Sequence, residues 1–354
     1  MKHRVTIGGD FPLEGGGSLT DVTVEVRTWG RHRKNATLIC HALTGDANAD
    51  DWWSGLFGTG RVFDPANEFI VSMNVLGSCY GTTGPTFPDP DGRPYGPRFP
   101  KVTIRDIVEV QRHTLDELGV ETLDLIIGGS MGGMQVLEWA ALYPDRVGSI
   151  VPIGVGITQS PWAIALSEAQ RHAIITDPEF QDGHYAAERQ PSGGLATARM
   201  IAMVSYRSHA EFAHRFGRSE DADGFAAQSY LRYQGSRFVD RFDANTYLTL
   251  IDAMDSHDLG RGRGPAEAIL RRIDTPGLVV GISTDALYPV SEVRELAAML
   301  PRCRFAVLDS IYGHDSFLVD TDALNDLVMA FRAQPRRAVP IRRPAEPGHG
   351  ASWA

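Results

Sequence analysis

Ser130 has the surroundings that best suit a catalytic nucleophile, because it lies in the glycine-rich segment 128–132 (GGSMG). An apolar run, residues 123–128, precedes it, and a helical pattern over residues 131–143 follows it. In such a strand–turn–helix context the turn is so tight that the serine is strained and nearby residues, here Gly128 and Gly132, must lack a Cβ atom. The turn also places Ser130 at a helix N-terminus, where backbone N–H groups favour developing negative charge. We therefore interpret Ser130 as a nucleophile that accepts an acyl group, rather than as an incidental serine in a glycine-rich turn.

Activating such a serine requires a base, and the base requires an acid that orients it. After a strand–turn–helix nucleophile the expected chain order is acid, then histidine. Asp285 follows the apolar run 278–282, and His314 follows the run 305–308. These positions at strand ends favour a triad of Ser130, Asp285 and His314. The alternatives are a helix or turn cap for Asp285 and an ordinary loop histidine for His314.

An acyl enzyme also needs hydrogen-bond donors for the oxyanion of the tetrahedral intermediate. We expect one to be the N–H of Met131, and the other to come from the loop after the apolar run 36–40, with Leu43 favoured. His41 lies in the same loop and is a candidate second base. Because it directly follows a buried run, we interpret it as a hydrogen-bonded structural histidine.

The elements that must position these residues alternate along the chain. Near-continuous apolar runs are typical of strands buried on both faces of a parallel sheet. We expect such strands at residues 36–40, 69–74, 123–128, 147–153, 278–282 and 305–308, after an opening antiparallel pair at 5–7 and 22–28. Helices are expected at 104–118 and 131–143, from a cap at Ser291 onward, and at 322–332. Together these elements predict an α/β-hydrolase fold, with a mostly parallel central sheet flanked by helices.

The alternation stops for about a hundred residues and then resumes. From residue 161 to about 264 the chain is rich in Ala, Arg, Glu, His and aromatic residues, and we expect helices and no strand there. This pattern predicts an α/β-hydrolase core, 1–157 and 266–335, interrupted by a helical lid, 158–265. The Pro- and Arg-rich end, 336–354, is expected to be a mobile tail.

The composition excludes several classes of protein. There are 34 Lys and Arg against 44 Asp and Glu, and the formal net charge of −10 argues against a partner such as nucleic acid. Cys40, Cys79 and Cys303 are too few and too scattered for a disulfide framework or a CxxC metal site, so we expect reduced thiols and no metal. No apolar run reaches the ~20 residues that span a bilayer, and the N-terminal residues lack a signal-peptide pattern. We expect a cytoplasmic protein without a membrane partner.

Several motifs besides GGSMGGMQVLEWA resemble the homoserine O-acetyltransferase family, acyl-CoA-dependent enzymes of methionine biosynthesis. The similarity runs from about residue 8 to residue 331, with the motifs in the family's order. The motifs are CHALTGDA at Cys40, NVLGSCYGTTGPT at Asn74, RPYGPRFPKVTIRD ending at Asp106, SPWAIALSEAQRHAI at Ser160, GLATARMIAMVSYRS at Gly194, RFDANTYL at Arg241, AMDSHDLGRG at Ala253, TDALYP at Thr284 and YGHDSFL at Tyr312.

The resemblance implies a two-step reaction with the same triad. Ser130 would take an acetyl group from acetyl-CoA, a co-substrate rather than a bound cofactor, and the γ-hydroxyl of L-homoserine would then attack the acyl-enzyme. It also implies that Arg199 binds the carboxylate of homoserine, with help from Tyr206 seven residues later, and that Asp315 binds the ammonium group. A planar guanidinium suits a carboxylate. Without the resemblance, a solvated helix arginine and a helix cap are the preferred interpretations of Arg199 and Asp315.

The same resemblance implies a homodimer formed through the lid. Trp52 and Trp53 are interpreted as packing residues rather than ligand contacts. They lie in segment 46–58, which is shorter than the corresponding family loop and borders the expected acyl site. The alternatives are a homoserine O-succinyltransferase or a serine O-acyltransferase on the same scaffold, and a carboxylesterase in which water is the acceptor. A scaffold that only binds is expected to have lost a triad residue, and none is lost.

Overall fold

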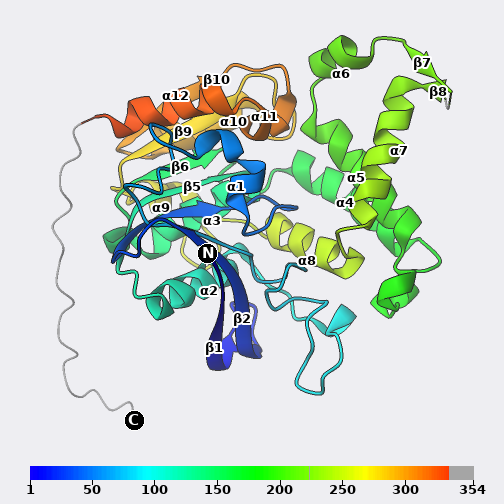
Figure 1. Ribbon diagram of the computed structural model, residues 1–354, viewed down its shortest axis with the longest axis horizontal. Helices are drawn as coiled ribbons and strands as arrows, with labels where there is room; N and C mark the ends of the chain where they lie inside the picture. The colour runs from blue at the N-terminus through cyan, green and yellow to red at the C-terminus, as the bar shows by residue number, and fades with distance from the viewer. Residues whose placement is uncertain (223, 335–354) are drawn as a thin grey trace.

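The computed structural model describes residues 1–222 and 224–334 of the 354-residue chain. Its centre is an eight-stranded sheet in the order β1-β2-β4-β3-β5-β6-β9-β10 (Figure 1). The strands are β1 (Lys2–Pro12), β2 (Ser18–Trp29), β3 (Asn35–Cys40), β4 (Ile70–Met73), β5 (Thr122–Gly129), β6 (Ile150–Ile153), β9 (Gly277–Ile282) and β10 (Cys303–Leu308). The pairs β1–β2 and β2–β4 are antiparallel, and every pair from β4 to β10 is parallel. The prediction of a mostly parallel sheet with an opening antiparallel pair is confirmed.

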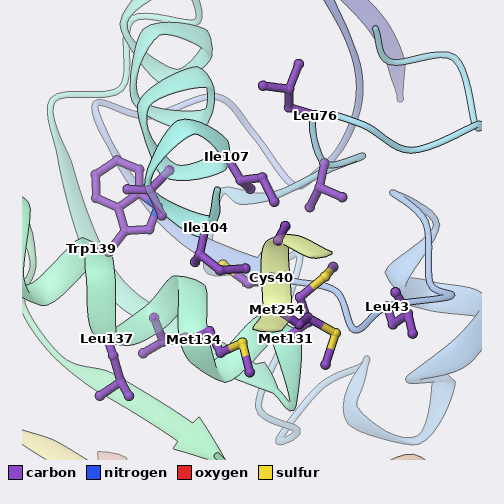
Figure 2. Packing of buried hydrophobic residues seen from close by; sticks show 14 of the residues in the cluster. Cys40, Leu43, Leu76, Ile104, Ile107, Met131, Met134, Leu137, Trp139 and Met254 are labelled. Carbon is purple, nitrogen blue, oxygen red and sulfur yellow. The ribbon is translucent and has the colours of Figure 1, made fainter. Parts of the chain in front are cut away.

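Helices cover both faces of the sheet because neighbouring strand residues point into different apolar clusters. Ile126 belongs to the larger cluster, which α2 (Ile104–Glu117), α3 (Met131–Leu142) and α10 (Val290–Met299) complete. Figure 2 shows part of this cluster, in which Ile104 and Ile107 lie beside residues of α3. Ile127 belongs to the second cluster, which α12 (Thr321–Arg332) and residues 49–63 cover.

The chain between β6 and β9 is mostly helical. Its helices are α4 (Pro161–Ile175), α5 (Ser192–Tyr206), α6 (His209–Phe216), α7 (Ala226–Val239), α8 (Ala244–Asp255) and α9 (Ala266–Leu270). In Figure 1, α4 to α7 stand to one side of the sheet and α8 lies between them and the core. Tyr247, Leu250 and Met254 of α8 join the larger core cluster, so this helix connects the inserted helices to the sheet.

Two details differ from the sequence predictions. The helical block contains a small hairpin, β7 (Glu220–Asp221) and β8 (Gly224–Phe225), whose two-residue strands are too short to leave an apolar pattern. Helix α10 begins at Val290 and not with a cap at Ser291, because the extended residue Pro289 precedes it and Ser291 falls in the first turn. The predicted tail, 336–354, lies outside the described residues. Over the described part of the chain, no helix is both long and apolar enough to cross a membrane.

Candidate active site

Ser130 occupies the turn between β5 and α3 with a positive φ of 57°, one of four such values for non-glycine residues in the described chain. A backbone of this kind costs about 1–3 kcal/mol and persists only where the surroundings impose it. Its N–H donates to the carbonyl oxygen of Ile153 at 2.9 Å, at the end of the adjacent strand β6. The turn is therefore fixed at the carboxyl edge of the sheet.

The flanking glycines explain how this turn packs so closely. A Cβ on Gly128 would lie 2.7 Å from the carbonyl oxygen of Cys40, and one on Gly132 only 2.2 Å from the same atom. Both distances are shorter than real Cβ contacts allow. The absence of side chains at these two positions lets the Ser130 turn press against the end of β3.

Asp285 and His314 form a buried pair, with the Nδ1 atom of His314 2.7 Å from Oδ2 of Asp285. The other carboxylate oxygen of Asp285 accepts hydrogen bonds from the N–H groups of Leu287 and Tyr288 at 2.8 and 2.9 Å. Burial alone would lower the pKa of His314, but the Asp285 carboxylate outweighs it, so that this pKa lies above its usual value. The Nε2 atom is buried without a hydrogen-bond partner among the described residues. Pairing at Nδ1 holds the proton there and leaves Nε2 to act as a base.

The end of β6 brings the predicted nucleophile and this pair together. Gly154 directly follows Ile153, the residue whose carbonyl oxygen binds the N–H of Ser130. A Cβ on Gly154 would lie 3.3 Å from Cε1 of His314 and 3.4 Å from Oδ2 of Asp285. The three residues predicted as a triad thus lie at the adjacent carboxyl ends of β5, β6, β9 and β10.

The expected oxyanion donors lie on either side of the Ser130 turn. Met131 is the first residue of α3, so its N–H has no acceptor within the helix. Leu43 lies in the turn after β3, against which Gly132 packs. Arg241, which belongs to the chain inserted between β6 and β9, stabilises this turn. Its Nη1 atom donates to the carbonyl oxygen of Thr44 at 2.9 Å and to Tyr80 Oη at 2.7 Å.

His41 has the structural role expected of it. Its Nδ1 lies 2.8 Å from the carbonyl oxygen of Ala42, and its Nε2 accepts the N–H of Val75 at 3.0 Å. Burial lowers the pKa of His41, which favours the neutral ring. Trp53 is also buried, and its indole N–H donates to the carbonyl oxygen of Phe317, in agreement with a packing role.

Helix α5 carries Arg199 and Tyr206 toward the predicted base. The Tyr206 ring lies 5.8 Å from the His314 ring. The Arg199 guanidinium lies 5.8 Å from the Tyr206 ring and 5.0 Å from the Phe238 ring, and its Nη1 atom is buried without a hydrogen-bond partner among the described residues. Burial raises the pKa of Tyr206 to about 12, so its hydroxyl stays protonated. The structure thus brings both predicted residues to the site, with an unsatisfied cationic donor.

Asp315 directly follows the predicted base and contacts an arginine that the sequence reasoning missed. Oδ2 of Asp315 lies 3.2 Å from Nε of Arg207, the residue after the end of α5. Burial raises the pKa of Asp315, and Arg207, Arg199 and His314 oppose that increase. Arg207 lies in a motif quoted for the resemblance, but nothing in its spacing indicates a partner more than a hundred residues away.

Comparisons with known proteins define the class of protein first. Residues 35–321 match the family model for the alpha/beta hydrolase fold. The solved structure of esterase E22 has the same fold, with a TM-score of 0.86, 26% identity and coverage of 94% of this chain and 99% of that chain. The chain therefore has the alpha/beta hydrolase fold, in agreement with its sheet order.

Relatives with higher sequence identity identify the family within this fold class. The chain is 54% identical over 327 residues to homoserine O-acetyltransferase from Chlorobaculum tepidum, covering 91% of this chain and 92% of the relative. The solved homoserine O-acetyltransferase from Staphylococcus aureus gives a TM-score of 0.78 at 27% identity, covering 94% of this chain and 95% of that chain. The chain belongs to the homoserine O-acetyltransferase family.

Proposed function

We propose that this protein transfers the acetyl group of acetyl-CoA to the γ-hydroxyl of L-homoserine through an acyl-serine intermediate. Membership of the homoserine O-acetyltransferase family makes it an acyltransferase. The observation that carries the residue assignment is the buried Asp285–His314 pair beside the strained Ser130 turn. A nucleophile, a base with a free nitrogen and an orienting carboxylate are the parts that acyl transfer through serine requires.

In the first half-reaction, Nε2 of His314 removes the proton from Oγ of Ser130, which attacks the thioester carbonyl carbon. The N–H groups of Leu43 and Met131 stabilise the resulting oxyanion. The C–S bond then breaks, His314 returns the proton to the departing thiolate, and the acetyl group remains on Ser130. Asp285 holds the ring of His314 and stabilises its charged form throughout.

In the second half-reaction, the γ-hydroxyl of homoserine gives its proton to Nε2 of His314 and attacks the acyl-serine. A new ester forms, the bond between the acetyl carbon and Oγ of Ser130 breaks, and Nε2 of His314 returns the proton to Oγ, which restores the free enzyme. We assign Arg199, with Tyr206, to the carboxylate of homoserine and Asp315 to its ammonium group. A zwitterion needs one fixed cation and one fixed anion, and the unsatisfied Nη1 of Arg199 supports the first role.

We also propose the domain division 1–157 and 266–335 for the core and 158–265 for the lid, with a homodimer formed through that lid. Trp162, Val204 and Tyr233, on α4, α5 and α7, expose 57%, 58% and 60% of their surface, and a second copy would cover them. Light scattering on the full chain is expected to give the mass of a dimer, and Val204→Glu with Tyr233→Glu to give a monomer. A monomeric wild-type protein would refute this assembly.

We place the enzyme in the cytoplasm, which its three free cysteines support.

The test of the activity is a matrix of two donors and three acceptor conditions. Acetyl-CoA and succinyl-CoA are each mixed with homoserine, serine or no acceptor, and release of CoA is followed. Fast release is expected only with acetyl-CoA and homoserine together. Full-rate release without an acceptor would indicate a hydrolase, and a preference for succinyl-CoA or serine would indicate the corresponding acyltransferase.

A further inference from the structure

The segment between α5 and α6 packs directly on the loop that carries His314. A Cβ on Gly313, whose φ is +69°, would lie 2.7 Å from both the carbonyl oxygen of Tyr206 and the backbone nitrogen of Ser208. The Ser208 hydroxyl donates to the carbonyl oxygen of Ile311, and it accepts the N–H of Glu211 at the start of α6. This close backbone contact fixes the position of the intervening residue, Arg207.

Arg207 lies between two carboxylates. Its Nε atom is 3.2 Å from Oδ2 of Asp315, and its Nη1 atom is 3.4 Å from Oε1 of Glu211. The side chains of Arg207 and Asp315 expose only 15% and 14% of their surface, and that of Glu211 only 4%. Ion pairs screened this weakly by solvent affect orientation and ionisation more than exposed pairs do.

We infer that Arg207 is a positioning residue that holds the Asp315 carboxylate ionised and oriented for the ammonium group of the acceptor. This inference rests on the role proposed above for Asp315. The contact with Arg207 involves Oδ2, and we assign the other oxygen, Oδ1, to the ammonium group.

The charges around Asp315 explain why this support is needed. Burial and the nearby Asp285 favour its neutral form, whereas Arg207, Arg199 and His314 favour its charged form. A neutral carboxyl group cannot pair with ammonium by charge. Removing Arg207 would therefore weaken binding of the acceptor and leave the acceptance of acetyl by Ser130 intact.

Arg207→Met is the direct test, and Arg215→Met is its matched control. Arg215 pairs with the same Glu211 at 3.5 Å, but it is half-exposed and forms no ion pair with Asp315 within the described part of the chain. Arg207→Met is expected to raise the KM for homoserine by about tenfold or more, because Asp315 loses the cation paired with it and its neutral form is favoured. Arg207→Lys should recover part of this loss. Arg215→Met should change the KM for homoserine by no more than about twofold.

The rate of the first half-reaction shows whether the Arg207→Met variant is correctly folded. The rapid release of CoA that accompanies acetylation of Ser130 is expected to keep its wild-type rate and amplitude in Arg207→Met. In that variant the rise of the homoserine KM on acidification should begin at a higher pH than in the wild type, because Asp315 has lost a cation that kept it charged. An unchanged homoserine KM, or an equal loss in both half-reactions, would overturn the positioning role.

A double variant separates this inference from the proposed function. If Arg207 acts through Asp315, Arg207→Met combined with Asp315→Asn should be no worse than Asp315→Asn alone. Additive losses would show that Arg207 acts on the substrate directly and would overturn the inference. A homoserine KM unaffected by Asp315→Asn would instead refute the proposed role of Asp315, and a wild-type protein without homoserine-dependent turnover would refute the proposed function.

Discussion

The sheet and the inserted helices hold their polar groups differently at the candidate active site. Asp285, at the end of β9, has both carboxylate oxygens occupied by hydrogen bonds from the protein. On the helical side, Nη1 of Arg199 and Oε2 of Glu211 are buried with no hydrogen-bond partner among the described residues. A buried polar group left unsatisfied costs about 1–3 kcal/mol. The protein itself thus fixes Asp285 on the sheet side, whereas Arg199 on the helical side keeps a donor for which we propose the carboxylate of the acceptor as partner.

If this comparison is correct, substitutions on the sheet side stop both half-reactions, whereas substitutions on the helical side mainly weaken binding of the acceptor. The largest effect is expected for Ser130→Ala, which removes the group that carries the acetyl. Turnover should fall by several orders of magnitude, because catalytic triads act as a unit. CoA release with homoserine measures this, and circular dichroism checks the fold. Near-normal turnover would remove Ser130 from the mechanism.

Asp285→Asn is expected to be the next most damaging change. It takes away the carboxylate that fixes the proton on Nδ1 of His314, and kcat should fall about a thousandfold or more. His314 must be neutral to act as a base, so wild-type kcat/KM should fall as the pH drops through its raised pKa. In the Asp285→Asn variant, no carboxylate at this position opposes the effect of burial, so the pKa of His314 should fall. The acidic limb of the curve of kcat/KM against pH should therefore move to lower pH. A limb that stays in place in pH–rate profiles would mean that another group titrates.

Arg199→Ala tests the helical side of the comparison. It removes the cation assigned to the carboxylate of the acceptor, and the KM for homoserine should rise about ten- to a hundredfold. The KM for acetyl-CoA and the rate of Ser130 acetylation should be nearly unchanged. Steady-state kinetics with each substrate varied in turn measure both values. Equal increases in the two KM values would contradict the carboxylate role.

Arg241→Met should have the smallest effect, because this exposed residue of the inserted region contacts the core through hydrogen bonds to Thr44, in the turn that carries Leu43, and to Tyr80. Losing its hydrogen bonds to Thr44 and Tyr80 should lower kcat up to about tenfold, with little change in either KM. The matched control is Arg237→Met, which removes an arginine near the end of α7 that forms an ion pair with Asp240. A loss of the same size in the control would point to a general effect on α7.

The sheet was predictable from the sequence because its signals are local. Buried strands give unbroken apolar runs, and the glycines around Ser130 mark a turn that only small residues permit. Asp285 and His314 could be predicted because each follows such a run. The family resemblance, and not residue spacing, drew attention to Arg199 and Asp315.

The missed features depend on contacts that form only when the chain folds. Arg207 meets Asp315, and Arg241 meets Thr44, across long stretches of sequence, and an arginine at a helix end has no local sign of such a partner. The hairpin of β7 and β8 was missed for a different reason, since two residues per strand are too few to show a period.

The contact between Gly313 and the segment 206–208 has a consequence for how this enzyme responds to heat. Local unfolding of peripheral elements requires less free energy than global unfolding of a core sheet. Because Gly313 is the neighbour of His314, undocking of the helices would displace the base while the strands are still paired. Thermal inactivation should therefore precede the melting of the sheet, and amide hydrogen exchange is expected to show protection lost first in α5 and α6.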